Sequence, residues 1–108
     1  MIGIDFYKTI STNPKLFKRL AESYMSSGYP VYIVSAVALK NVSKLRENVK
    51  KSKVPHTHLE IVIFDDYEDI APLKLAACKR LGIKVMYDDM ESVCTLLAAN
   101  DICTLQVR

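Results

Sequence analysis

Short runs of apolar and β-branched residues alternate along the whole chain with segments whose apolar residues recur at helical spacing. The runs cover residues 2–4, 31–34, 61–64, 83–87 and 102–107, and their length and composition are typical of buried strands. Strict alternation with short connections favours a parallel sheet whose right-handed crossovers place helices on both faces. We therefore expect an α/β fold, a three-layer α/β/α Rossmann-like domain with a five-stranded parallel sheet.

The segments between these runs carry the signals that start and stop helices. Asn13 precedes Pro14, an order typical of an N-cap and a first helical position, and Gly82 follows the third segment where a helix commonly ends. The second segment, residues 40–53, is an amphipathic helix with a lysine-rich outer face. The apolar stripes that predict the four helices are Leu16, Phe17, Leu20, Ala21 and Tyr24; Val42, Leu45 and Val49; Leu73, Ala76, Ala77 and Leu81; and Val93, Leu96 and Leu97.

Composition narrows the class of protein further. With 108 residues, 50% of them hydrophobic, the chain has the size of one domain, which we place at residues 1–108. Three Gly and four Pro exclude collagen-like and low-complexity chains. The apolar runs fall short of the ~20 residues that cross a bilayer, and the N-terminus lacks a secretory pattern. Cys78, Cys94 and Cys103 show no disulfide or zinc spacing, so we expect a cytoplasmic protein without membrane contact.

Charge is distributed unevenly along the chain. Residues 1–56 carry ten Lys or Arg against three Asp or Glu, whereas residues 57–108 carry five against nine. A basic half of this kind can dock an anionic chain, and an acidic half can hold a cation. The simpler interpretation of the lysines in residues 40–53 is a solvated helix face, and both interpretations stay open.

Polar residues follow the predicted strands, where ligands bind in open parallel sheets. Asp5, Asp88 and Asp89 would converge if the first and fourth strands were neighbours. Clustered carboxylates repel one another unless a cation lies among them, and oxygen ligands suit Mg²⁺. Asp65 and Asp66, after the third strand, are better explained as helix caps.

These residues carry a resemblance to a known family. Residues 2–9 resemble the first motif of the haloacid dehalogenase (HAD) superfamily, an apolar strand followed by Asp-x-Asp-x-Thr. Residues 31–35 resemble its second motif, an apolar strand that ends in Ser or Thr. The segment from Lys74 to Asp89 resembles the third and fourth motifs joined. The resemblance covers nearly the whole chain, with each motif on the expected element.

The resemblance implies a role for each matching residue. Asp5 would be the nucleophile that becomes a transient aspartyl phosphate. Ser35, Thr9 and Lys74 would bind the phosphoryl group, and Lys74 would offset its charge. The resemblance also places Tyr7 among the catalytic residues. Tyr7 occupies the position where most phosphatases of this superfamily have the second Asp.

The metal site and the chemistry of Tyr7 follow from the same resemblance. Asp88 and Asp89 would hold Mg²⁺ together with Asp5 and the backbone carbonyl of Tyr7. A phenol with a pKa near ~10 is a poor replacement for the acid and base that the second Asp supplies. We therefore expect slow turnover, or turnover confined to leaving groups that need no acid, such as aryl or acyl phosphates.

Three functions remain as alternatives. The first is a Mg²⁺-dependent phosphohydrolase, and the second is a catalytically impaired HAD-like module that binds a phosphorylated or anionic partner. Haloacid dehalogenases themselves carry Tyr at the position of Tyr7, but they enclose the substrate with a cap, and the connections after Tyr7 and Phe64 are too short for one. Capless members act on large substrates, so a nucleic-acid end or a phosphoprotein is expected, and a homo-oligomer that supplies a lid stays open.

Three further patterns have weaker interpretations. A response-regulator receiver shares the alternating architecture, but it needs an acidic pair after the first strand, where Asp5 stands alone, and a Lys after the fifth strand. His56 and His58 lie two residues apart without a third ligand at a telling spacing, so we interpret them as loop residues. Cys78 and Cys94 fall beside apolar helical stripes and are expected to be small buried hydrophobes.

Overall fold

The computed structural model of the protein describes residues 1–108 as a five-stranded parallel sheet with helices between the strands. The strand order is β3-β2-β1-β4-β5, and every neighbouring pair is parallel. The α/β class and the order of elements predicted from the sequence are confirmed. The strands are β1 (Ile2–Ile4), β2 (Val31–Val37), β3 (His58–Ile63), β4 (Val85–Asp88) and β5 (Cys103–Gln106); the α-helices are α1 (Pro14–Ser26), α2 (Val42–Ser52), α3 (Ile70–Leu81) and α4 (Glu91–Ala98).

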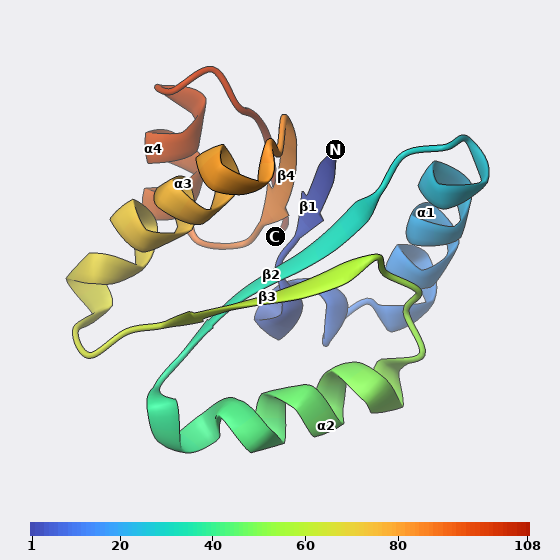
Figure 1. The fold of residues 1–108 in the computed structure, drawn as a ribbon, viewed down its shortest axis with the longest axis horizontal. Helices are drawn as coiled ribbons and strands as arrows, with labels where there is room; N and C mark the ends of the chain where they lie inside the picture. The colour runs from blue at the N-terminus through green and yellow to red at the C-terminus, as the bar shows by residue number, and fades with distance from the viewer.

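The helices form two outer layers around the sheet (Figure 1). Helices α1 and α2 cover one face, and α3 and α4 cover the other. Because neighbouring residues of a strand point to opposite faces of the sheet, the strands contribute side chains to two separate buried clusters. Ile4 and Ile33 pack with the α1 and α2 side chains, whereas Val34 and Met86 pack with those of α3 and α4. None of the helices is both long and apolar enough to cross a bilayer.

Four of the five strands have bounds that differ from the sequence-based expectation, and β5 covers Cys103–Gln106 in place of 102–107. Strand β2 continues past Ser35 to Val37, so Ser35 lies within the strand and not after it. Strand β4 begins at Val85, because the Ile83 N–H bonds to the Cys78 carbonyl and closes the end of α3. Strand β3 begins at His58, and Phe64 lies beyond its end.

Gly3 is the one position in β1 where no side chain fits. A Cβ there would lie 2.6 Å from Met86 Sδ and 3.2 Å from two side-chain carbons of Ile83. Met86 and Ile83 are themselves almost fully buried, so they have little room to move. Gly3→Ala should therefore lower the free energy of unfolding by about 1–3 kcal/mol, measured by chemical denaturation. A loss no larger than that of an exposed Ala99→Ser control would contradict the close packing.

Candidate active site

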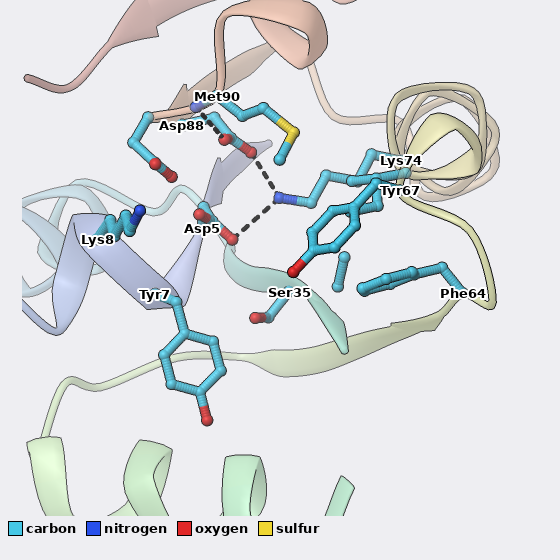
Figure 2. A pocket seen from close by; sticks show the side chains of 12 residues that line it. Asp5, Tyr7, Lys8, Ser35, Phe64, Tyr67, Lys74, Asp88 and Met90 are labelled. Carbon is cyan, nitrogen blue, oxygen red and sulfur yellow. Dashed lines mark hydrogen bonds and ion pairs between the residues drawn. The ribbon is translucent and has the colours of Figure 1, made fainter. Parts of the chain in front are cut away.

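A cavity of about 260 Å³ lies at the carboxyl ends of the three central strands, β2, β1 and β4 (Figure 2). This is the edge at which the sequence predicts ligand binding, because parallel strands present all their carboxyl ends on one side. Strands β1 and β4 are neighbours, which brings together residues far apart in the chain. The lining residues are Asp5, Tyr7, Lys8, Ser35, Ala36, Phe64, Tyr67, Ile70, Lys74, Asp88, Asp89 and Met90.

Lys74 connects the ends of β1 and β4. Its ammonium Nζ donates to Asp5 Oδ1 at 3.0 Å and to Asp88 Oδ2 at 2.6 Å, and all three side chains are buried. Helix α3 presents this lysine to the sheet, and the dashed lines in Figure 2 mark both interactions. One buried cation therefore orients two buried carboxylates. Its two hydrogen-bonded ion pairs offset the free energy that these carboxylates lose when they leave water.

Asp88 and Asp89 close the cluster from the β4 side. The Met90 backbone N–H donates to Asp88 Oδ1 at 3.0 Å, so both oxygens of Asp88 are bonded. Carboxylate oxygens of Asp5, Asp88 and Asp89 all lie within 4.8 Å of one another. Three carboxylates against one lysine leave the cluster with negative charge, and oxygen donors this close together can hold a metal ion.

The electrostatics of the cluster reflect its burial. Burial raises the pKa of Asp5 to about 8; the Lys74 ammonium opposes this shift, and the neighbouring Asp88 and Asp89 carboxyls add to it. Burial alone would lower the pKa of Lys74, but the charges of Asp5 and Asp88 outweigh it and raise that pKa above its ordinary value. Lys74 is therefore a permanent cation, and its charge offsets only part of the effect that burial has on the pKa of Asp5.

Two buried hydroxyl groups near the cluster have no hydrogen-bond partner, Ser35 Oγ and Thr9 Oγ1. Ser35 lines the cavity from β2, so its free hydroxyl is available to a ligand there. Thr9 is fully buried and is not among the lining residues. Of the two predicted phosphate-binding hydroxyls, the structure therefore brings only that of Ser35 to the cavity.

Tyr7 and Lys8 lie in the turn that follows Asp5. The Tyr7 hydroxyl accepts a hydrogen bond from Asn48 Nδ2 of α2 at 3.3 Å, and Figure 2 shows the ring pointing away from Asp5. Lys8 has a left-handed backbone with φ 59°, and its exposed side chain lines the cavity. The turn thus presents the Lys8 side chain to the cavity and directs the Tyr7 hydroxyl away from Asp5, toward Asn48.

Phe64, Tyr67 and Lys8 line the cavity, although the motifs of the sequence do not point to them. Phe64 follows a run of apolar residues and is easily assigned to the strand. The sequence does contain a signal that Tyr67 is functional. It lies between two acidic pairs, Asp65-Asp66 and Glu68-Asp69, and so belongs to no apolar stripe that would place it in the core. Its side chain is 78% exposed, which is unusual for so large an aromatic ring.

The residues of the alternative sites have other surroundings. Asp65 and Asp66 are exposed and do not line this cavity, so neither lies beside Asp5 as a receiver's phosphoacceptor would. His56 Nδ1 contacts the Val54 carbonyl, and His58 Nε2 contacts Glu60. Burial raises the pKa of the thiol groups of Cys78 and Cys94, which favours the unreactive protonated form.

Comparison with known proteins gives a likeness of fold. No protein-family model and no curated protein sequence matches the chain. Two chains from structures of the Pnkp1/Rnl/Hen1 RNA repair complex superpose on 98% of this chain, with TM-scores of 0.79 and 0.77 and sequence identities of 13% and 14%. The superposed part is 41% and 45% of those chains, so this chain spans less than half their length. At such identities the likeness establishes the Rossmann-like α/β fold.

Proposed function

We propose that the protein is a Mg²⁺-dependent phosphohydrolase that acts through an aspartyl-phosphate intermediate on Asp5. The observation that supports this proposal most is the cavity that joins the buried carboxylates of Asp5 and Asp88 to the ammonium of Lys74, with Asp89 beside them. These residues come from three different elements and agree with the resemblance to the HAD superfamily. Perturbed ionisable groups that converge in a cavity are typical of active sites.

In the proposed reaction a carboxylate oxygen of Asp5 attacks the phosphorus of a phosphomonoester. The bond from Asp5 to phosphorus forms while the bond from phosphorus to the ester oxygen breaks, and the leaving group departs with the electron pair. Water then attacks the phosphorus, which releases inorganic phosphate and restores the Asp5 carboxylate. Lys74 keeps Asp5 in position and offsets charge on the phosphoryl oxygens, to which the free Ser35 hydroxyl donates.

The donor set fits Mg²⁺, because carboxylate oxygens are the ligands that this ion prefers. Asp5, Asp88 and Asp89 would hold it together with the backbone carbonyl of Tyr7. When bound, the ion keeps Asp5 ionised and neutralises negative charge that develops on the phosphoryl group.

The orientation of Tyr7 limits the substrates. Because its hydroxyl bonds to Asn48 and points away from Asp5, Tyr7 is not placed to protonate an ester oxygen that departs from Asp5. Aryl and acyl phosphates leave without help from an acid, so they are the expected good substrates. The same observation supports the second candidate function, a module that binds a phosphorylated partner without turnover.

Two observations favour a macromolecular substrate. The connections after β1 and β3, residues 5–13 and 64–69, are too short to contain an inserted cap domain. The structural neighbours are chains of an RNA repair complex, which supports a nucleic acid as the macromolecular substrate. A substrate large enough to cover the cavity would exclude water in the place of a cap.

Hydrolysis of p-nitrophenyl phosphate by the purified protein tests the proposed activity. We expect phosphate release with Mg²⁺ and its loss after treatment with EDTA. Release that continues undiminished in EDTA would exclude the metal-dependent reaction. Absence of release with Mg²⁺, in a protein shown to be folded by circular dichroism, would leave the binding module as the better description.

Mg²⁺ should also stabilise the fold, because it binds the folded cluster and not the unfolded chain. At a concentration of 100 times its dissociation constant, the ion adds ~2.7 kcal/mol to the free energy of unfolding, which is measurable as a rise in melting temperature. Asp89→Asn should reduce this rise, whereas Asp66→Asn, an exposed carboxylate outside the cluster, should not. Equal rises in the two variants would place the cation elsewhere.

Tyr7→Asp should restore the missing acid. For alkyl phosphates, whose leaving groups need a proton, we expect kcat to rise by up to ~10²-fold, while hydrolysis of p-nitrophenyl phosphate changes little. Tyr7→Asn is the matched control, because it has the same size as the Asp variant and cannot donate an acidic proton. A similar gain in both variants would attribute the effect to space and not to acid catalysis.

A further inference from the structure

A second groove, of about 570 Å³, adjoins the cavity that contains Asp5. Tyr7, Ala36, Phe64 and Tyr67 line both spaces, so the groove begins where the cavity ends. It continues between the start of α2 and the connection from β3 to α3, which lie next to each other at one end of the sheet (Figure 1). Its size is in the range of small-ligand sites, roughly 300–1,000 Å³.

The wall of the groove on the α2 side is basic. Lys40 and Lys44 are exposed, and neither forms an ion pair within the protein. The only carboxylate on α2, that of Glu47, pairs with Lys51 at 2.9 Å and does not line the groove. The side-chain amides of Asn41 and Asn48 complete this wall. Two free ammonium groups and two amides form a surface suited to phosphate groups.

The opposite wall is aromatic. The rings of Phe64 and Tyr67 lie 5.3 Å apart with an angle of 43° between their planes, and the Tyr67 ring is largely open to solvent. In Figure 2 both rings lie beside Ser35 at the edge of the cavity. Asp65 also lines this wall, and its negative charge disfavours phosphate there. An exposed ring suits a planar base, whose amino group can donate to the Asp65 carboxylate.

We propose that this groove binds single-stranded nucleic acid whose terminal phosphate enters the cavity at Asp5. The proposal rests on the phosphohydrolase function proposed above, and it names the substrate class. The terminal phosphate lies at Ser35 and Lys74, the preceding phosphates follow Lys40 and Lys44, and a base stacks on Tyr67. A nucleotide chain carries charge along one side and flat bases along the other, as the two walls require.

A phosphopeptide matches the groove less well. It brings one phosphate, which the cavity would take, and leaves Lys40 and Lys44 without an anionic partner. It also has no set of planar groups at regular spacing for the aromatic wall, and an acidic peptide would meet the charge of Asp65. Double-stranded nucleic acid keeps its bases stacked inside the helix, so it cannot use Tyr67.

Binding to an inactive variant tests the proposal without a need for turnover. Fluorescence anisotropy with the Asp5→Asn protein would compare fluorescein-labelled six-nucleotide RNA and DNA strands that carry a 3′ or a 5′ phosphate. The same strands as duplexes and a phosphopeptide of equal charge serve as competitors. We expect a phosphorylated single strand to bind about 5- to 150-fold more tightly than the phosphopeptide, the factor that one stacked base supplies.

Variants of the two walls assign the contacts. Lys40→Gln and Lys44→Gln should each weaken binding of all sequences alike and reduce the slope of log affinity against log salt by about 1. Lys50→Gln on α2 and Lys79→Gln on α3, both exposed and outside the groove, should leave the slope unchanged. Tyr67→Leu should weaken binding about 5- to 150-fold, and Tyr29→Leu, another exposed tyrosine, should not.

The outcomes separate this proposal from the proposed activity. Equal binding of phosphopeptide and single strand, or equal salt slopes in the groove and control lysine variants, would overturn the groove assignment even if the wild-type protein hydrolyses p-nitrophenyl phosphate. Binding that depends on Lys40, Lys44 and Tyr67 supports the assignment even if p-nitrophenyl phosphate is not hydrolysed, in which case only the phosphohydrolase proposal fails. Melting curves of every variant show that a loss of binding is not a loss of fold.

Discussion

Asp5→Asn should reduce Mg²⁺-dependent phosphate release by roughly 10³-fold or more. An amide cannot attack phosphorus as a carboxylate does, so no aspartyl phosphate can form. The substitution keeps the size of the side chain and leaves a carbonyl oxygen that can accept from Lys74, so the cavity should keep its shape. Release of phosphate from p-nitrophenyl phosphate measures the loss. Asp66→Asn, which removes an exposed carboxyl outside the cavity, is the matched control.

The same variant should change how stability depends on pH. Because burial raises the pKa of Asp5 from 3.8 to about 8, between these pH values the folded metal-free protein holds a proton that the unfolded chain has lost. The free energy of unfolding therefore falls as pH rises through this window. Asp5→Asn cannot titrate, so its stability should fall less over the same range. Parallel stability curves for the two proteins in EDTA would contradict the raised pKa of the buried Asp5 carboxyl.

Lys74→Met should have the largest effect on stability of any single substitution in the cavity. Methionine has a similar length but no charge, so it would leave the buried carboxylates of Asp5 and Asp88 without their cation. Loss of one partner from a buried ion pair costs about 3–5 kcal/mol. Chemical denaturation in the absence of Mg²⁺, at a pH above 8 where Asp5 is ionised, measures this cost. Lys79→Met, five residues further on the exposed side of α3, should change stability by no more than ~0.5 kcal/mol.

A double variant shows whether the cost comes from charge or from packing. If uncompensated carboxylates cause the loss, then Asp5→Asn combined with Lys74→Met should be more stable than Lys74→Met alone, because one buried charge has been removed. Strictly additive effects would mean that methionine simply fits the space poorly. A Lys74→Met protein as stable as Lys79→Met would contradict the ion cluster itself.

The sequence predicts structure best where a residue pattern is compatible with only one local structure. Alternating apolar runs predict the strands of the sheet, and Gly82 indeed ends α3 in a left-handed conformation with φ 72°. The sequence predicts that Asp5 and Asp88 converge if the first and fourth strands are neighbours, and the pairing of β1 with β4 meets that condition. The helix, strand and carboxylate patterns thus predict the layers, the strand directions and the acidic side of the cavity.

The sequence pattern does not predict in which direction the side chains around the cavity point. A lysine on a helix is usually solvated, and the resemblance to a known motif assigns Lys74 only to the phosphoryl group. Its burial and its contact with Asp5 are visible only in the structure. Tyr7 follows the nucleophile closely, yet the turn sends its hydroxyl to Asn48, which lies 41 residues away in the chain. Phe64 and Tyr67 line the cavity from the connection after β3, a strand that ends one residue earlier than its apolar run suggests. Each of these features depends on tertiary contacts that local periodicity cannot encode.

The central position of β1 has a consequence for how the molecule folds. This strand is made first, but one of its two partners is β4, and the contact between Asp5 and Lys74 closes a loop of 69 residues. Closing so long a loop is costly in chain entropy, which delays the contact until the elements between have formed. Until β4 is in place, one edge of β1 has unpaired amide and carbonyl groups that can recruit another chain. Protection of that edge and assembly of the aspartate-lysine cluster are therefore the same folding event.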